Sequence, residues 1–199
     1  MNRNQKTVVF ILILGLSFSL LLMGVQSLTA ERIRLNQEFD VQSAILDAFD
    51  ESYTIANFND VFEEVMETIE TDDVTLYVHE ASGGFAFEFR GLGVWGPISG
   101  IIAFETDFET ILYIRVLEQE ETPGLGGVVA ETDYLAKYQG ATMSNGGLIV
   151  SQTANPEASN EVDAILGATR TSNAFEGMLN AAYEEHKAAW DAYDGGSST

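Results

Sequence analysis

Four short β-rich runs lie within residues 74–116, which read VTLYVHEASGGFAFEFRGLGVWGPISGIIAFETDFETILYIRV. β-Branched and aromatic residues dominate each run, and glycines or acidic residues separate one run from the next. That pattern is typical of short strands joined by turns. We therefore expect an antiparallel sheet with strands at Val74–His79, Phe85–Phe89, Ile98–Phe104 and Ile111–Val116.

Helical patterns precede these runs. Residues 31–49 place several apolar side chains at spacings compatible with one helical face, so we expect a helix there. Asn57–Glu70 has apolar residues at i, i+4, i+7, i+8 and i+11, which predicts a second helix packed on the core.

The pattern changes again after Leu117. A final helix is expected from Ser172 to about Tyr193, with Thr171 or Ser172 as its N-cap. Together these segments predict an α+β fold in which helices flank an antiparallel sheet. The other elements expected in this part are a short helix around Glu131–Tyr138, a strand at Leu148–Gln152 and a loop at Asn155–Asn160.

The N-terminal segment is apolar enough to cross a membrane. Thr7–Ala30 contains no charged residue, and its apolar centre, Val8–Val25, spans about 27 Å as a helix. A cleaved signal peptide is the alternative, but Leu28 stands where a cleavage site prefers a small residue. We expect an uncleaved, single-pass anchor in the cytoplasmic (inner) membrane. Arg3 and Lys6 then remain in the cytoplasm, and the C-terminal domain is extracytoplasmic.

Four segments follow from these patterns. They are a cytoplasmic stub with the transmembrane anchor at 1–30, a helical stalk with a lead-in helix at 31–72, a domain at 73–193, and a disordered tail at 194–199.

Composition excludes several classes of protein. The chain has no cysteine, so it has no disulfide framework, zinc ribbon or thiol nucleophile. Its formal charge of −22 argues against binding to nucleic acid. His79 and His186 are the only histidines, and their spacing gives no signal of a metal site. We expect His186 on a solvated helix face and His79 either exposed or hydrogen-bonded in the core. No residue is predicted to be catalytic.

Gly91–Gly96 (GLGVWG) fits the spacing of a dinucleotide-binding motif. That motif requires a helix after the glycines, whereas Pro97 and a β-branched run follow here. We therefore expect a tight turn that presents Trp95.

Two further segments combine glycines, hydroxyls and charges. Glu121–Gly127 (ETPGLGG) permits close approach of its backbone to a flat or anionic ligand. Asp163–Ser172 (DAILGATRTS) places small residues and hydroxyls just before a helix, where free N–H groups favour a phosphate. Taken alone, each segment is better explained as a turn or a helix cap.

In this order behind an N-terminal anchor, Gly91–Gly100, Glu121–Gly126 and Asp163–Ser172 resemble the FMN-binding subunits of two membrane redox complexes. These are the RnfG protein of the Rnf electron transport complex and the NqrC protein of the Na⁺-translocating NADH:quinone oxidoreductase (Nqr). The resemblance covers roughly residues 85–185 and, more weakly, the helix around Asp40–Leu46.

The resemblance implies covalently bound FMN. In that family a flavin transferase uses FAD to join FMN, through its phosphate, to the last Thr of the motif Asp-x-x-(Ser/Thr)-Gly-Ala-Thr. That residue corresponds to Thr169, with Thr171 as the alternative attachment site, and Leu166 replaces the motif's Ser or Thr. The expected cofactor-binding residues are Asp163, Gly167, Ala168, Thr169, Arg170 and Thr171, together with Glu121, Thr122, Gly124, Leu125, Gly126 and Trp95.

The resemblance also implies a function. The chain is expected to relay electrons through FMN within an ion-translocating Rnf- or Nqr-type complex, with other subunits, a flavin transferase and the membrane as partners. Three alternatives stay open: a stand-alone extracytoplasmic flavoprotein, a binding or structural module of the same fold without flavin, and a secreted form that has lost residues 1–30.

Overall fold

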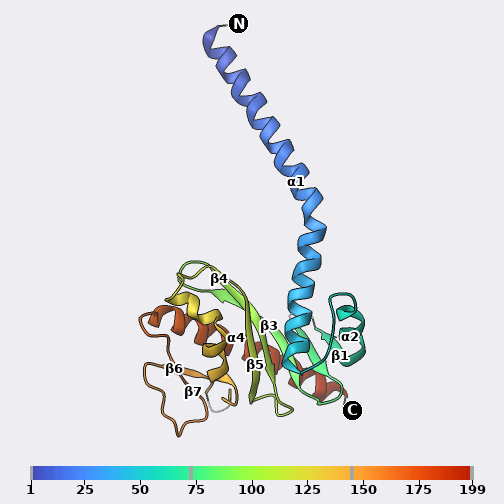
Figure 1. Cartoon of the computed structure of the whole chain (residues 1–199), viewed down its shortest axis with the longest axis vertical. Coiled ribbons are helices and arrows are strands. Elements are labelled where there is room, and N and C mark those ends of the chain that lie inside the picture. The colour runs from blue at the N-terminus through green and yellow to red at the C-terminus, as the bar shows by residue number, and fades with distance from the viewer. Residues whose placement is uncertain (1, 72–73, 144–145, 198–199) are drawn as a thin grey trace. The chain divides into compact units, whose positions relative to one another are not determined.

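The computed structural model describes residues 2–71, 74–143 and 146–197 (Figure 1). The chain divides into two compact units, Met1–Phe39 and Asp40–Thr199. Helix α1 (Arg3–Ala48) begins in the first unit. Among the described helices, α1 alone is long and apolar enough to cross a membrane, and the side chains of its apolar stretch are exposed. The long apolar N-terminal helix expected from the sequence is therefore present.

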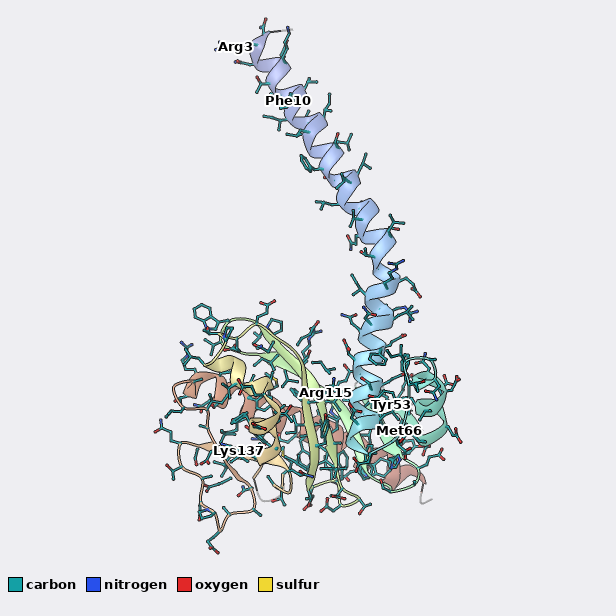
Figure 2. All side chains as sticks on the ribbon, viewed as in Figure 1. Arg3, Phe10, Tyr53, Met66, Arg115 and Lys137 are labelled. Atoms are coloured by element: carbon teal, nitrogen blue, oxygen red, sulfur yellow. The ribbon has the colours of Figure 1, made fainter. Side chains whose placement is uncertain are left out.

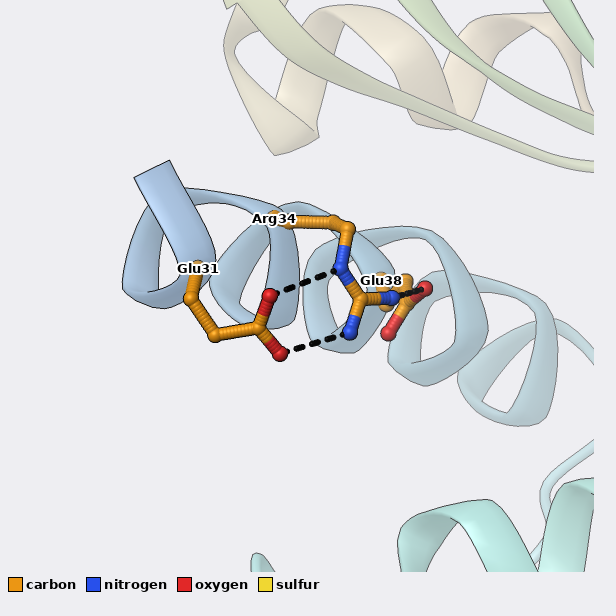
Figure 3. A network of polar contacts seen from close by, with 3 residues as sticks. All are labelled: Glu31, Arg34 and Glu38. Carbon is orange, nitrogen blue, oxygen red and sulfur yellow. Dashed lines mark hydrogen bonds and ion pairs between the residues drawn. The ribbon is translucent and has the colours of Figure 1, made fainter. Parts of the chain in front are cut away.

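The polar turns of α1 that follow the apolar stretch carry a small charge cluster. Arg34 pairs with Glu31, one turn before it, at 2.8 Å and with Glu38, one turn after it (Figure 3). Such i,i+3 and i,i+4 pairs support a solvated helix. The hydrogen bonds and charge of Arg34 lower the pKa of Glu31.

Five strands in sequence order form the antiparallel sheet: β1 (Met66–Glu70), β2 (Thr75–His79), β3 (Phe85–Leu92), β4 (Pro97–Phe104) and β5 (Ile111–Gln119). Helix α2 (Phe58–Val65) leads into β1. The four strands predicted from the sequence are confirmed, and so is the antiparallel pairing. A β-strand follows Gly91–Gly96, so the predicted turn is confirmed and the dinucleotide-binding motif is excluded.

Successive side chains along each strand point to opposite faces of the sheet. Both faces are covered, and each forms a core. Phe87 and Phe89 of β3 contribute to one core, under α4 (Thr169–Ser197). Ala86 and Ile101 contribute to a second core, with the last turns of α1 and with α2. Figure 1 shows β6 and β7 on the side of the sheet away from α2, and α4 passing behind the sheet.

Asp47, in the last turn of α1, connects that helix to the sheet. Its carboxylate accepts hydrogen bonds from the Tyr53 hydroxyl and from Arg115 on β5, each at 2.8 Å. Figure 2 labels Tyr53 and Arg115 on either side of the end of α1. These contacts lie within Asp40–Thr199 and fix the helix end against β5.

The segment after β5 consists of short elements and one long helix. The predicted short helix is present as α3 (Thr132–Leu135) and η2 (Ala136–Tyr138), preceded by η1 (Gly126–Ala130). The predicted strand appears as β6 (Ile149–Ser151), which pairs in parallel with β7 (Glu161–Asp163). Helix α4 continues past Tyr193 to Ser197, and residues 198–199 of the expected tail lie outside the described residues.

The predicted helix over Asn57–Glu70 is wrong in its second half. The helix ends at Val65, and Met66–Glu70 is strand β1, paired residue for residue with β2. Met66 and Ile69 are buried in either arrangement, so helical spacing could not distinguish them. Pairing with a strand outside the segment decided the outcome.

His186 is buried rather than solvated. Its ring stacks on Phe87 with centroids 3.9 Å apart, and Nδ1 donates to the carbonyl oxygen of Ala182. The sequence suggested a solvated position because His186 is flanked by charged residues, Glu184, Glu185 and Lys187. His79 is also buried, and hydrogen bonds to Ser82 and Glu51 satisfy its ring.

The burial of His186 predicts a pH dependence of stability. Burial lowers the pKa of His186 below its ordinary 6.5, so on acidification the unfolded chain takes up a proton before the folded chain does. The contribution of His186 to the free energy of unfolding is thus complete above pH 6.5, its ordinary pKa, and is lost as the pH falls from there through the lower pKa of the folded state. Urea unfolding of the full chain in detergent, at about pH 7.5 and about pH 5.5, measures the free energy of unfolding. Between these two pH values it should fall by more for wild type than for His186→Gln. Equal losses would contradict the account.

Candidate FMN site

The first turn of α4 carries the candidate attachment residue. Thr169 is the first residue of this helix, and both Thr169 and Arg170 are exposed. The N–H groups at the start of a helix lack intrahelical acceptors, and together with the helix dipole they favour an anion. Gly167, at φ +81°, makes the turn into the helix. This geometry suits a phosphate on the Thr169 hydroxyl.

The predicted N-cap is wrong by about three residues, because α4 begins at Thr169 rather than near Ser172. Ser172 instead holds the preceding loop from inside the helix. Its hydroxyl accepts the N–H of Ile165 at 3.0 Å and donates to the carbonyl of Ala168 at 3.1 Å. Its contribution to the site was missed, because a serine near a helix start is usually taken for its cap.

Asp163 lies at the end of β7, exposed and close in sequence to α4. Its carboxylate accepts the N–H of Ala154 at 2.9 Å. It therefore fixes the loop after β6. Ala168 is buried, so this residue contributes packing and its backbone to the site.

Glu121 joins the three segments that the sequence singled out. Its Oε1 accepts the N–H groups of Val94 at 2.6 Å and Trp95 at 3.0 Å, in the β3–β4 turn. Its Oε2 accepts the hydroxyl of Thr171, on α4, at 2.8 Å. The side chain of Glu121 is only 5% exposed, and within the described part of the chain no Lys or Arg pairs with it. Neutral donors thus stabilise a buried carboxylate.

Two glycines make room for this carboxylate. A Cβ at Gly126 would lie 2.4 Å from Oε2 of Glu121 and 2.7 Å from the hydroxyl oxygen of Thr171. A Cβ at Gly93 would lie 2.4 Å from Oε1 of Glu121. The glycines therefore allow three backbone segments to close around one side chain.

The loop between Glu121 and η1 is compact but open to solvent. The carbonyl of Thr122 accepts the N–H groups of Leu125 and Gly127 at 3.1 and 3.0 Å. Gly124, at φ +73°, turns the chain between them. Thr122, Gly124 and Leu125 are exposed, as a ligand-binding loop requires.

Exposed apolar side chains gather on these segments. Trp95 is 71% exposed, Leu125 48% and Leu166 97%. A Cβ at Gly167 would lie 3.5 Å from Cδ2 of Leu125, so the Leu125 loop and the turn before Thr169 are neighbours. A flat, apolar ring tethered at Thr169 would find such side chains nearby, and in this respect the residues fit FMN.

The two threonines of the motif differ in accessibility. Thr169 is exposed, whereas Thr171 is 3% exposed and donates its hydroxyl to Glu121. The geometry therefore favours Thr169 for attachment and gives Thr171 a structural role. Glu121 likewise holds backbone segments, with its carboxylate turned inward, although it was expected among the cofactor-binding residues.

Substitution of Gly126 tests the packing around Glu121. Gly126→Ala should destabilise the full chain by about 1–3 kcal/mol, because the added methyl group overlaps the carboxylate. Gly177→Ala is the matched control, since a Cβ there meets nothing within 4 Å. It should stabilise α4 by about 0.5–1 kcal/mol. Urea unfolding of both variants in detergent measures the difference, and equal effects would refute the packing argument.

Comparison with known proteins shows what the domain resembles. Residues 93–184 match the model of the FMN-binding domain family. The NqrC protein of Pasteurella multocida, part of its Na⁺-translocating NADH-quinone reductase, is 35% identical over 89 residues, covering 43% of this chain and 34% of that protein. The corresponding protein from Pseudomonas aeruginosa is 31% identical over 117 residues, covering 53% and 45%. The chain thus spans less than half the length of these curated relatives.

Solved structures show the same fold. The NqrC of Shewanella oneidensis superposes with a TM-score of 0.61 at 20% identity, covering 71% of this chain and 89% of that one. The corresponding protein from Parabacteroides distasonis gives a TM-score of 0.65 at 21% identity, covering 76% and 92%. The expected resemblance is confirmed: the chain is similar to NqrC proteins over part of their length, and its residues 93–184 match the FMN-binding domain model.

Proposed function

We propose that this chain is a membrane-anchored flavoprotein subunit that carries FMN covalently on Thr169 and relays electrons within an Nqr- or Rnf-type complex. The observation that carries the proposal is the exposed hydroxyl of Thr169 at the N-terminus of α4, beside the glycine-rich loop of Leu125. The match of residues 93–184 to an FMN-binding domain supports the identity of the cofactor.

Attachment proceeds by phosphoryl transfer from FAD on a flavin transferase. The Oγ of Thr169 attacks the phosphorus on the FMN side of FAD, a P–O ester bond forms, and the pyrophosphate bond breaks to release AMP. The hydroxyl proton leaves to solvent or to a base of the transferase. The N-terminus of α4 and the exposed guanidinium of Arg170 then stabilise the phosphodiester.

Exposed apolar side chains of this region would hold the isoalloxazine ring, and Leu125 and Trp95 are the candidates. FMN supplies the electron chemistry, since a flavin accepts and donates electrons. The residues of this chain hold the flavin and orient it. An ester bond retains the cofactor outside the cytoplasm, where a dissociated flavin would be lost by dilution.

The partners follow from the relatives. NqrC is by name one part of a Na⁺-translocating NADH-quinone reductase, and we assign this chain an equivalent place beside other redox subunits. Its α1 spans the cytoplasmic membrane once, with Arg3 and Lys6 in the cytoplasm and Asp40–Thr199 outside. The functional segments are then an anchor at 1–30, a stalk with its lead-in at 31–72 and the flavin domain at 73–193.

Mass spectrometry of the chain co-expressed with a flavin transferase tests the attachment. Wild type should gain the mass of FMN less one water, on a peptide containing Thr169, and show flavin fluorescence in a denaturing gel. Thr169→Ala should lose both signals. Thr171→Ser should keep both, because it retains the buried hydroxyl that donates to Glu121.

A known substrate of the same transferase serves as the positive control. If that control is modified and wild type is not, the covalent proposal fails. The remaining candidate is then a module of this fold without flavin, for which the exposed Leu166 in the motif is the specific observation. Leu166→Ser restores the family's hydroxyl at a position that contacts solvent, so a gain of FMN in this variant alone would assign the failure to Leu166.

A further inference from the structure

Glu121 is the one carboxylate that the described part of the chain buries. The residue is 5% exposed, and the other buried polar side chains among the described residues belong to serine, threonine and histidine. The sequence has 31 acidic residues, so the burial of this one is an exception. Both of its oxygens accept hydrogen bonds, two from backbone N–H groups and one from a hydroxyl, as an ionised carboxylate does.

The negative charge of Glu121 lies where the three segments assigned to FMN binding meet. Oε1 accepts the backbone N–H of Trp95 at 3.0 Å, and Oε2 accepts the hydroxyl of Thr171, in the first turn of α4, at 2.8 Å. A Cβ at Gly126, next to Leu125, would collide with the same carboxylate. A ring held by Trp95 and Leu125 therefore has this charge behind the surface on which it rests.

The hydrogen bonds of Glu121 do not by themselves require a charge. A neutral side-chain amide offers an oxygen to the two N–H groups and an NH₂ group to the hydroxyl oxygen of Thr171. Burying an ionised carboxylate costs more free energy than burying such an amide. The carboxylate adds a negative charge in a region of low dielectric constant, where its effect on a neighbouring group is larger than in water.

We propose that the buried carboxylate of Glu121 lowers the reduction potential of the FMN carried on Thr169. Reduction by two electrons, with uptake of one proton, leaves the flavin ring with one additional negative charge, and a nearby negative charge opposes this change. Charges near the ring are one means by which a protein sets the potential of its flavin. The carboxylate thus makes reduced FMN a stronger electron donor to the next carrier. The inference rests on the proposed function, because it takes FMN to be attached at Thr169.

The other charged side chains at the site are exposed, which allows a matched control. Arg170 and Asp163 are exposed, and so is Glu120, which lies beside the same turn as Glu121. A Cβ at Gly96 of that turn would lie 2.7 Å from Cβ of Glu120. Water and salt weaken the effect of exposed charges. Glu120 therefore has the same charge as Glu121 and a neighbouring position, and it differs in exposure.

A reductive titration measures the potential directly. The full chain is co-expressed with a flavin transferase, purified in detergent and titrated with dithionite against a reference dye, while flavin absorbance is recorded. The equilibrium constant for two-electron reduction should be about tenfold higher in Glu121→Gln than in wild type, a rise in potential of about 30 mV. Glu120→Gln should change that constant by less than about twofold.

Two further measurements separate the charge from the fold. Amide exchange in the chain without flavin should show Val94 still protected in Glu121→Gln, because the amide oxygen accepts the same N–H. Raising the salt concentration from about 0.1 M to about 1 M should leave the difference between Glu121→Gln and wild type largely unchanged, since salt screens buried charges little. Mass spectrometry verifies one FMN per chain in every titrated sample.

Equal potentials in wild type and Glu121→Gln, or equal shifts in the two variants, would overturn the inference. Fast exchange at Val94 in Glu121→Gln would do the same, because it would contradict the hydrogen bonds on which the argument depends. Loss of FMN from Glu121→Gln with Val94 still protected would assign the carboxylate to attachment instead. A wild-type chain without FMN would contradict the proposed function, and this inference with it, so the mass spectrum distinguishes the two failures.

Discussion

The carboxylate of Glu121 is the interaction on which the candidate site depends. It is buried without a cation among the described residues, and it accepts hydrogen bonds from the β3–β4 turn and from Thr171 on α4. A buried carboxylate is costly unless its oxygens are satisfied, so these donors and the carboxylate require one another. The backbone positions of Trp95, Leu125 and the first turn of α4 are consequently linked, although they belong to segments about 25 and 50 residues apart in the chain.

The sheet supplies the rigid base for this arrangement. Because β3 and β4 are covered on both faces, their shared turn projects from a packed three-layer structure. α4 packs on β3 and presents its N-terminus beside that turn, with Gly91 permitting the close contact to Met178. The exposed side chains of Trp95, Leu125 and Leu166 lie on loops beside this base. A tethered flavin there would be held on one side and accessible on the other, which suits an electron carrier.

Much of the fold could be predicted from the sequence, because four strands and three helical segments have strong local patterns. Met66–Glu70 could not, since its pairing with β2 outweighs a helical spacing that buries the same residues. β7 is only three residues long, and His186 lies among charged neighbours. The motifs did locate the site around Thr169. Glu121 was identified as part of it, but its role in bonding the turn at Val94 depends on a contact 27 residues away that no local pattern encodes.

Amide hydrogen exchange at Val94 is the most direct test of this account. In the folded full chain the N–H of Val94 should exchange slowly, because its acceptor is the buried carboxylate of Glu121. In Glu121→Ala it should exchange at least about tenfold faster, while Glu105, whose N–H donates to the carbonyl of Thr110 at the far end of β4, stays unchanged. Glu121→Gln should keep Val94 protected, since the amide oxygen can accept the same bond. Exchange at Val94 that is fast in wild type, or unaltered in Glu121→Ala, would contradict the account.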